Sequence, residues 1–532
     1  MSDPDYNCAA GQPLALVAQP HPRGCPHWMR RTPPQDSLPA QDRASTGIAG
    51  LDDVLGGGLP SNHVYLVEGD PGSGKTTLGL HFLLEGVRQN ERGLYVTLSE
   101  TAQELHTVAR SHGWSLDGIE LFELVSSEGL SPDLEQSILH PSQVELGETV
   151  RGVIAAVERL KPQRVVFDSL SEMRLLAQDP LRYRRQVLAL KKFFSDQGCT
   201  VMLLDDRSSR DTDQQLHSIA HGVINLEQVV DQYGPGRRRM RVMKMRGIKF
   251  RGGDHDFVLD TGGLSVFPRL VAAEHRLQTE YRLVSSGVPK LDELMGGGLA
   301  CGSNTLFSGP SGVGKTTTAV SCVMAALRRG ESAVYYLFDE GLSTLVIRAR
   351  SLGMDLGPYL DSGKLRVVAL DPAEVSAGEF AHMVRHAVEA GNAQIVVIDS
   401  LNAYLQAMPG SKYLMLQMHE LLTYLNHRNI VTILILAQHG VLGEMRTEVD
   451  MSYLADAILL FRFFEARGHL LKAVSMVKSR TSRHEQTIRE FRMGTQGLEV
   501  GHELTDFEGV LAGVPAYHGK LPLLGDSARG TR

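Results

Sequence analysis

The sequence predicts the α/β fold class, in two tandem copies that each form a mainly parallel sheet between helices. Three observations carry this prediction. The second half of the chain repeats the first, with 240 residues between the matching lysines Lys75 and Lys315. Each copy alternates short, β-branched apolar runs with longer helical stretches. Each copy also places a glycine-rich loop between an apolar run and a helical one.

The length and composition are typical of a multidomain globular protein. The chain has 532 residues, 42% hydrophobic and 22% charged, which suffices for buried cores and excludes a wholly disordered chain. Its 54 Lys and Arg face 61 Asp and Glu, and the net charge of −7 argues against an obligate nucleic-acid binder. The longest apolar run, 430–437, is far shorter than the roughly 20 residues of a membrane span. The first thirty residues lack the apolar core of a signal peptide, so we expect a cytoplasmic protein without a membrane segment.

The internal repeat sets the expected domain boundaries. Residues 47–77 align with residues 287–317 without a gap. Further matching segments follow in the same order: 94–100 with 334–340, 165–170 with 396–401, and 244–246 with 478–480. A period this long corresponds to a whole domain and not to a solenoid repeat. The expected parts are a flexible Pro-rich arm at 1–45, domains at 46–275 and 285–515, and a short tail at 516–532.

Four apolar runs in each copy are predicted to be strands of the sheet. They are apolar on both faces, as in a parallel sheet that helices cover on both sides. In the first copy the runs are 63–69, 94–100, 164–170 and 200–206. In the second copy they are 304–309, 333–340, 394–401 and 430–438.

Two glycine-rich loops match the G-x-x-x-x-G-K-[ST] pattern of a phosphate-binding P-loop. Glycines let successive backbone N–H groups point at phosphate oxygens, at the positive end of the following helix. Lys75 and Lys315 supply a positive charge to the β- and γ-phosphates. Two matches at equivalent positions of a repeat predict two ATP sites. The expected nucleotide-binding residues are Gly69, Asp70, Pro71, Gly72, Ser73, Gly74, Lys75, Thr76 and Thr77, and in the second copy Gly309, Pro310, Ser311, Gly312, Val313, Gly314, Lys315, Thr316 and Thr317.

One aspartate ends a buried-looking strand in each copy, Asp168 in the first and Asp399 in the second. A carboxylate at such a place is costly unless it is paired or holds a cation. Together with the hydroxyls of Thr76 and Thr316, these carboxylates are the expected ligands of Mg²⁺, directly or through water. The alternative is that each aspartate caps the helix that follows it.

Carboxylates at the end of the preceding strand are the expected catalytic groups. The second copy has Asp339 and Glu340 there, whereas the first has Ser99 and Glu100, one carboxylate fewer. Such a carboxylate would orient or deprotonate the attacking water. Surface charge at a strand exit is the alternative for each residue alone, and its recurrence at matching places favours the catalytic interpretation.

Two P-loop domains in tandem, each with the same leader segment, resemble the KaiC family of RecA-like ATPases. The leader spans 51–59 and recurs at 291–299, each time with Leu-Asp at its start and Gly-Gly-Gly-Leu at its end. The resemblance covers roughly residues 45–515. It implies two tandem RecA-like P-loop NTPase domains that hydrolyse ATP with Mg²⁺. It also implies a homohexamer with ATP at the subunit interfaces.

Other positions of the family have counterparts in this sequence. The resemblance implies that a serine of the helix after the catalytic carboxylates approaches the nucleotide. It further implies that a Lys-x-Arg pair in each domain reaches the ATP of the neighbouring subunit. The residues implied in this way are Ser111, Lys244, Arg246, Ser351, Lys478, Arg480 and His484.

The resemblance also implies self-phosphorylation in the second domain. Ser452 falls on the phosphoacceptor serine of the family and Thr447 on a nearby threonine, whereas Tyr453 replaces the adjacent threonine. We therefore expect a serine/threonine autokinase modified mainly at Ser452, with a role in timing or signalling. A KaiB-like or other signalling protein is the expected partner besides the hexamer itself.

Two other classes of function remain as alternatives. A RecA- or RadA-type DNA-dependent ATPase has the same P-loop, but the net charge and the missing four-cysteine zinc knuckle argue against nucleic acid as a partner. The basic cluster at 237–249 overlaps the strand expected at the subunit interface. A nucleotide-gated scaffold with little catalysis is the second alternative, and Ser99 in place of a carboxylate favours it for the first domain.

Overall fold

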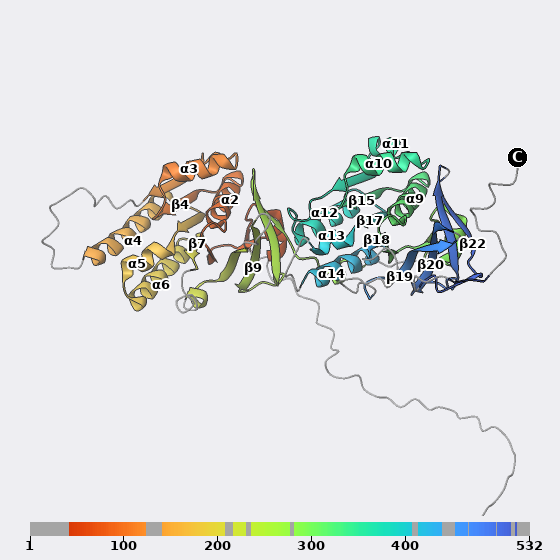
Figure 1. The fold of residues 1–532 in the computed structure, drawn as a ribbon. Coiled ribbons are helices and arrows are strands. Elements are labelled where there is room, and N and C mark those ends of the chain that lie inside the picture. The colour runs from red at the N-terminus through yellow and green to blue at the C-terminus, as the bar shows by residue number, and fades with distance from the viewer. Residues whose placement is uncertain are drawn as a thin grey trace, which may run out of the picture. The chain divides into compact units, whose positions relative to one another are not determined.

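A computed structural model confirms the α/β class in two tandem copies, each with its own nine-stranded sheet (Figure 1). The predicted arm, up to residue 41, and residues 519–532 of the predicted tail lie outside the described residues. Among the described helices, none combines the length and the apolar character that a membrane crossing needs. The structure describes residues 42–123, 141–207, 216–229, 236–276, 281–406, 413–438, 453–466, 468–495, 497–511 and 516–518.

The first copy contains a mixed sheet with helices between its strands. The strands of this sheet are β3 (Val64–Gly69), β4 (Gly93–Thr97), β5 (Ile119–Glu123), β6 (Arg164–Asp168), β7 (Thr200–Asp206), β8 (Gly222–Val229), β9 (Arg237–Met245), β10 (Asp254–Asp260) and β11 (Gly263–Phe267). Across the sheet, β5-β4-β6-β7-β3-β8 are parallel and β9-β10-β11 continue antiparallel. The other elements are β1 (Arg43–Ala44), α1 (Ala49–Leu55), β2 (Leu59–Pro60), α2 (Lys75–Arg88), α3 (Ala102–Ser111), α4 (Pro141–Leu160), α5 (Leu170–Ala177), α6 (Pro180–Asp196) and the 3₁₀ helix η3 (Ala272–His275).

The second copy repeats this topology strand for strand. Its sheet contains β14 (Ser303–Gly309), β15 (Ala333–Leu337), β16 (Leu365–Ala369), β17 (Ile395–Asp399), β18 (Val431–Ala437), β19 (Ala457–Ala466), β20 (His469–Ser479), β21 (Ile488–Gly494) and β22 (Gly497–Glu503). The order is β16-β15-β17-β18-β14-β19 in parallel, then β20-β21-β22 antiparallel. The other elements are β12 (Leu283–Val284), α8 (Pro289–Leu294), β13 (Leu299–Ala300), α9 (Lys315–Arg328), α10 (Leu342–Ser351), α11 (Gly357–Asp361), α12 (Ala377–Glu389), α13 (Leu401–Gln406), α14 (Leu414–His427), β23 (Phe507–Glu508) and β24 (Ala516–Tyr517).

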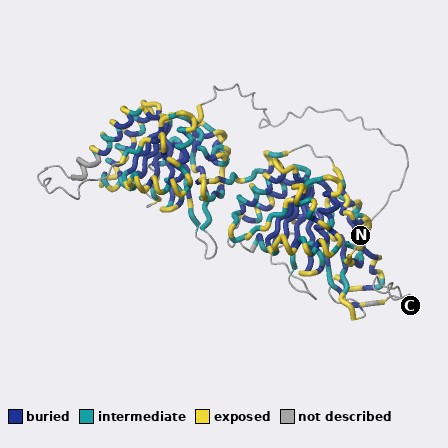
Figure 2. Tube along the Cα trace, turned by 90° about the horizontal axis from the view of Figure 1, so that it is seen from above, coloured by how far each residue is buried: buried dark blue, intermediate teal, exposed yellow. Residues whose placement is uncertain are grey.

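Each sheet separates two hydrophobic cores, because successive side chains of a strand point to opposite faces. In the second copy Phe307 and Tyr335 belong to the core built with α9 and α10. Leu306 and Tyr336 belong to the core built with α12, α13 and α14. Figure 2 shows buried residues in the interior and exposed residues on the outside of each copy. The runs that are apolar on both faces are therefore the central strands, as the sequence predicts.

The parallel register brings the predicted site residues to one edge of each sheet. Gly69 at the end of β3 pairs in register with Asp206 at the end of β7. Thr97 at the end of β4 pairs with Asp168 at the end of β6. In open α/β sheets ligands bind beyond the carboxyl ends of the strands. The P-loop and the predicted carboxylates therefore share that edge.

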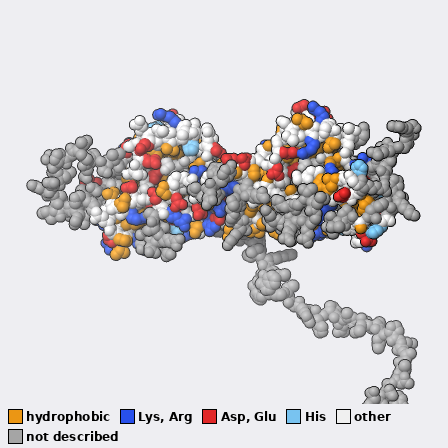
Figure 3. Space-filling model, viewed as in Figure 1, with side chains coloured by type: hydrophobic (Ala, Val, Ile, Leu, Met, Phe, Trp, Pro, Cys, Tyr) orange, Lys and Arg blue, Asp and Glu red, His pale blue; other side chains and the backbone are white. Residues whose placement is uncertain are grey.

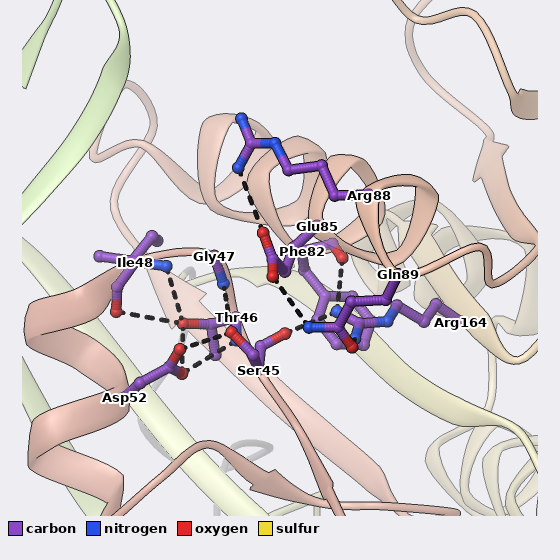
Figure 4. A network of polar contacts seen from close by, with 10 residues as sticks. All are labelled: Ser45, Thr46, Gly47, Ile48, Asp52, Phe82, Glu85, Arg88, Gln89 and Arg164. Atoms are coloured by element: carbon purple, nitrogen blue, oxygen red, sulfur yellow. Dashed lines mark hydrogen bonds and ion pairs between the residues drawn. The ribbon is translucent and has the colours of Figure 1, made fainter.

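The aspartate of the leader segment has a structural role in both copies. Asp52 on α1 accepts hydrogen bonds from the Ser45 hydroxyl at 2.7 Å and from the Thr46 backbone N–H at 2.9 Å (Figure 4). Asp292 on α8 accepts the equivalent bonds from Ser285 and Ser286, at 2.5 and 2.8 Å. The leader therefore ties the chain that enters each domain to its first helix.

A buried arginine distinguishes the first copy from the second. Arg164 at the start of β6 is 1% exposed, and its guanidinium donates to the Phe82 carbonyl oxygen at 2.9 Å (Figure 4). A Cβ on Gly86 would lie 2.6 Å from the Arg164 Cδ, so only glycine leaves room there. The matching positions of the second copy hold Ile395 and Ala326, an apolar pair. The two copies share a fold but not every buried contact.

Candidate functional site

The two P-loops have the same backbone conformation. Gly72 and Gly312 have φ values of 77° and 76°, and Gly74 and Gly314, directly before the helices, have 104° and 121°. These left-handed conformations favour glycine because a side chain would be strained there. They place the loop amides at the N-termini of α2 and α9, where backbone N–H groups and the helix dipole attract anions.

The P-loop lysines differ in their charged neighbours. Lys75 Nζ donates to the Gly69 and Asp70 carbonyl oxygens, both at 2.9 Å, and pairs with the Asp206 carboxylate at 2.7 Å. Lys315 Nζ donates to the Gly309 and Pro310 carbonyl oxygens at 2.8 and 2.7 Å.

The strand beside the P-loop explains this difference. The β18 residue in register with Gly309 is Ala437, which stands where β7 has Asp206. Burial lowers the pKa of Lys315 to about 8, although the Asp399 carboxylate acts to raise it. The second site therefore keeps its lysine in a more apolar setting than the first.

The predicted metal residues lie together in both copies. The Thr76 hydroxyl is 3.2 Å from Asp168 Oδ2, and the Thr316 hydroxyl is 2.8 Å from Asp399 Oδ2. Burial raises the pKa of both aspartates above the ordinary value, against the hydrogen bonds that they accept. A hydroxyl beside a buried carboxylate is a set of hard oxygen donors, and Mg²⁺ binds through such oxygens while it keeps several waters. The residues present therefore fit this metal.

A tyrosine that the sequence analysis missed supports each of these aspartates. Tyr95 on β4 donates its hydroxyl to Asp168 at 2.5 Å, and Tyr335 on β15 donates to Asp399 at 2.9 Å. Both tyrosines are fully buried. They occupy the same position of the repeat, 240 residues apart, and this recurrence is the signal that could have identified them.

The predicted catalytic carboxylates have different surroundings in the two copies. Glu100 has a buried Oε2 with no hydrogen-bond partner among the described residues. Its pKa is raised by burial first and then by the negative charges of Asp168 and Glu104. In the second copy, Asp339 accepts a hydrogen bond from the Ser400 hydroxyl. Ser99 has replaced this carboxylate in the first copy.

Glu340 is held by an arginine. Both of its oxygens accept from the Arg348 guanidinium, Oε2 from Nη1 at 2.9 Å and Oε1 from Nη2 at 2.5 Å. Arg348 lies on α10, and the matching residue of α3 is Val108. The sequence analysis missed Arg348 because no motif includes this helix position. The signal was the change from valine to arginine between the two copies.

A cavity of about 330 Å³ collects the predicted residues of the second copy. Its lining includes P-loop residues from Ser311 to Thr317, the carboxylates Asp339, Glu340 and Asp399, and Arg348. The cavity therefore joins the phosphate loop, the metal residues and the predicted base in one space.

The serines and the histidine implied by the resemblance make local contacts. The exposed Ser111 and Ser351 donate their hydroxyls to carbonyl oxygens of their own helices, Val108 at 2.7 Å and Arg348 at 2.8 Å. His484 Nδ1 is 2.8 Å from the Glu485 carbonyl oxygen. Their predicted contact with nucleotide remains a prediction.

The Lys-x-Arg pairs lie at the edge of the sheet away from the P-loop of their own copy. Lys244 is in register with Val223, near the start of β8, which runs parallel to β3. Its Nζ donates to the Ala220 carbonyl oxygen at 2.9 Å, before β8 begins. Arg246 donates to the Ser218 carbonyl oxygen at 3.0 Å.

The second pair has the same placement. Lys478 is in register with Ile458 near the start of β19 and donates to the Ala455 carbonyl oxygen at 2.8 Å. Arg480 contacts Asp456 Oδ1 at 3.5 Å and the Tyr453 carbonyl oxygen at 3.4 Å. Both pairs therefore point away from the nucleotide site of their own domain.

The predicted phosphoacceptors Ser452 and Thr447 lie outside the described residues. Their neighbour Tyr453 is described and is 53% exposed.

The basic strand β9 is partly neutralised within its own domain. Arg241 makes two hydrogen bonds with Asp254, at 2.6 and 2.7 Å, and Arg239 lies 3.6 Å from Asp256. Figure 3 shows basic and acidic side chains interspersed over the visible face. The charge that β9 offers to a polyanion is correspondingly reduced.

Comparison with known proteins decides the family. The family model for the KaiC ATPase matches residues 44–271 and again residues 284–505. The chain belongs to the KaiC family. Its two copies are therefore two KaiC-type ATPase domains in tandem.

Curated relatives resemble the chain over most of its length. The circadian clock oscillator protein KaiC of Parasynechococcus marenigrum is 27% identical over 88% of this chain and 92% of its own length. The protein of the same name from Synechococcus elongatus is 27% identical over 88% of this chain and 91% of its own. The circadian clock protein KaiC3 of Synechocystis is 26% identical over 90% and 95%.

Proposed function

We propose that this KaiC-family protein is a ring-forming ATPase with two Mg·ATP sites per chain and a serine autokinase activity in its second domain. The observation that carries the proposal is the duplicated arrangement at the carboxyl edge of each sheet. There a P-loop lysine, a threonine–aspartate pair and a carboxylate that follows the strand beside the aspartate lie at the same edge.

Each group has a defined task in this proposal. Lys75 and Lys315 neutralise the β- and γ-phosphates, and the loop amides cradle their oxygens. Thr76 with Asp168, and Thr316 with Asp399, hold Mg²⁺, which supplies positive charge to the phosphates when bound.

The carboxylates complete the reaction. Glu100 in the first domain takes the proton of the attacking water, and its raised pKa suits a general base. Glu340, assisted by Asp339, takes the proton of water or of an acceptor hydroxyl in the second domain.

Assembly follows from the Lys-x-Arg pairs. Lys244 and Lys478 contact backbone at the edge opposite to their own P-loops, which supports a role at the nucleotide of a neighbouring subunit. We propose a homohexamer that forms when ATP bridges the subunits. Mass photometry with and without ATP tests this, and a protein that stays monomeric at saturating ATP contradicts it.

The autokinase rests on the position of Ser452 and on the carboxylate pair of the second domain. Tyr453 has a longer and bulkier side chain than threonine, so a second phosphate on this residue is not expected. Incubation with Mg·ATP and peptide mapping should place phosphate mainly on Ser452, with Lys315→Ala as the control that abolishes it. No phosphate between Thr447 and Tyr453, with ATPase activity intact, would leave a pure ATPase.

The biological role proposed for the ring is timing or signalling through a protein partner. The support is that curated relatives named as circadian clock proteins resemble this chain over nearly their whole length. A KaiB-like protein is the first partner to test, by co-sedimentation with the ring in ATP and in ADP. DNA as a partner is disfavoured by the ion pairs of β9.

A further inference from the structure

The second nucleotide site contains a cation that no P-loop motif includes. Arg348 lines the same cavity as Lys315, Thr316 and Asp399. Its guanidinium is bound to both oxygens of Glu340, the base proposed above. Such a two-point contact occupies one acceptor site on each carboxylate oxygen and pairs the negative charge of the carboxylate with the positive charge of the arginine, so it disfavours protonation.

The charge of Arg348 extends to the metal residue. Burial raises the pKa of Asp399, and the positive charge of Arg348 is among the influences that lower it. The Arg348 side chain is 36% exposed and that of Glu340 23%, so neither is sealed in the core. The arginine can therefore exchange one anionic partner for another without unpacking the domain.

We propose that Arg348 is a γ-phosphate sensor of the second site, bound to Glu340 until a triphosphate draws it away. The γ-phosphate carries negative charge into the cavity that Arg348 lines, and planar guanidinium groups bind phosphate as well as carboxylate. When Arg348 moves to the phosphate, Glu340 becomes free to accept a proton. Only a triphosphate would then release the base. This inference rests on the proposed function of the second site and adds its regulation.

The first site shows that the arginine–glutamate contact is not a general feature of the fold. Val108 occupies the position of Arg348, and Glu100 Oε2 has no hydrogen-bond partner among the described residues. In this proposal Arg348 has two roles in the second site: it binds the γ-phosphate, and its departure frees Glu340.

The test is a binding cycle in the full chain carrying Lys75→Ala, so that bound nucleotide reports the second site. The affinities of a non-hydrolysable ATP analogue and of ADP are measured with and without Arg348→Val and Glu340→Gln. Arg348→Val should weaken the analogue by about tenfold, the size expected of one hydrogen bond to a charged group, and leave ADP nearly unchanged. Glu340→Gln should tighten the analogue severalfold, because it removes the competing anion.

The coupling between the two changes decides the proposal. Once Arg348 is replaced by valine, Glu340→Gln should no longer affect the preference for the analogue over ADP. Arg348→Lys should retain part of that preference, since it keeps the charge. Arg350→Val is the matched control, because Arg350 lies on the same helix but pairs with Asp355.

Two results would overturn the sensor. One is an unchanged preference in Arg348→Val, and the other is an equal effect of Glu340→Gln with and without Arg348. If the Lys75→Ala protein binds no nucleotide at all, the proposed second ATP site itself is wrong. Retained ADP affinity shows in each variant that the site has folded.

Discussion

The two proposed nucleotide sites contain the same predicted phosphate and metal residues but differ in where their ion pairs lie. In the first site the P-loop Lys75 is paired with Asp206, and the proposed base Glu100 has a buried oxygen without a hydrogen-bond partner among the described residues. In the second site the proposed base Glu340 is paired with Arg348, and Lys315 donates to backbone carbonyl oxygens. The ion pair therefore involves the P-loop lysine in the first site and the proposed base in the second.

This comparison shows that the two copies share the predicted phosphate and metal residues but differ in the ion pairs beside them. The Thr–Asp pair and its supporting tyrosine recur in both copies with similar geometry. The residues that distinguish the ion pairs of the two sites, Asp206 and Arg348, each occur in one copy. In our proposal, a triphosphate displaces an anion from the lysine of the first site and recruits an arginine in the second.

The largest effects should come from the predicted bases. Glu100→Gln, measured with the second site disabled by Lys315→Ala, should lower ATP turnover by about 10²- to 10⁴-fold, the usual contribution of a general base. Glu340→Gln should do the same when Lys75→Ala disables the first site. Phosphate release assays give both rates. Unchanged turnover in either variant would remove that glutamate from catalysis.

The next largest effects should follow from the P-loop lysines. Lys75→Ala and Lys315→Ala each remove one charge-assisted contact to phosphate, which costs on the order of 1.5–3 kcal/mol, or about ten- to a hundredfold in affinity. Each variant should therefore keep one of two nucleotides per chain in a quantitative titration. Loss of all nucleotide in a single variant would contradict independent sites.

Acid should reveal the state of Glu100. Because burial and neighbouring carboxylates raise its pKa, Glu100 is protonated at a higher pH than an ordinary glutamate. The base is lost as pH falls through this raised pKa, and turnover should then fall by up to tenfold per pH unit. The Lys315→Ala protein reports this first-site profile. An acid limb at the ordinary glutamate pKa of about 4.3 would show that Glu100 is not the titrating base.

The sequence alone was sufficient for the fold class, and the residues that it predicted for each site lie together at one edge of each sheet. The lysine, threonine and aspartate of each site recur at the same places because phosphate and metal chemistry requires these residue types, and the repeat doubles the signal. The strand runs were equally clear, since strands covered on both faces are apolar throughout.

The ion pairs could not be predicted in the same way. Asp206 meets Lys75 only because the register of β7 with β3 places it beside Gly69. Arg348 on α10 meets Glu340, eight residues earlier in the segment between β15 and α10. Both contacts depend on how strands and helices meet in space, and neither belongs to a spacing motif. The sequence shows that the two copies differ at these positions, but it does not show which residues the differing side chains contact.

The smallest expected effect tests the difference between the sites most directly. Asp206→Ala in the Lys315→Ala protein, and Ala437→Asp in the Lys75→Ala protein, exchange the residue beside the P-loop lysine between the two copies. The affinity of each variant for a non-hydrolysable ATP analogue should be measured at one ionic strength. Because the Asp206 side chain is 39% exposed, the expected change is modest, about two- to fivefold. The analogue should bind more tightly without Asp206 and more weakly with the new aspartate at position 437, whereas no change, or changes in the same direction, would contradict the account.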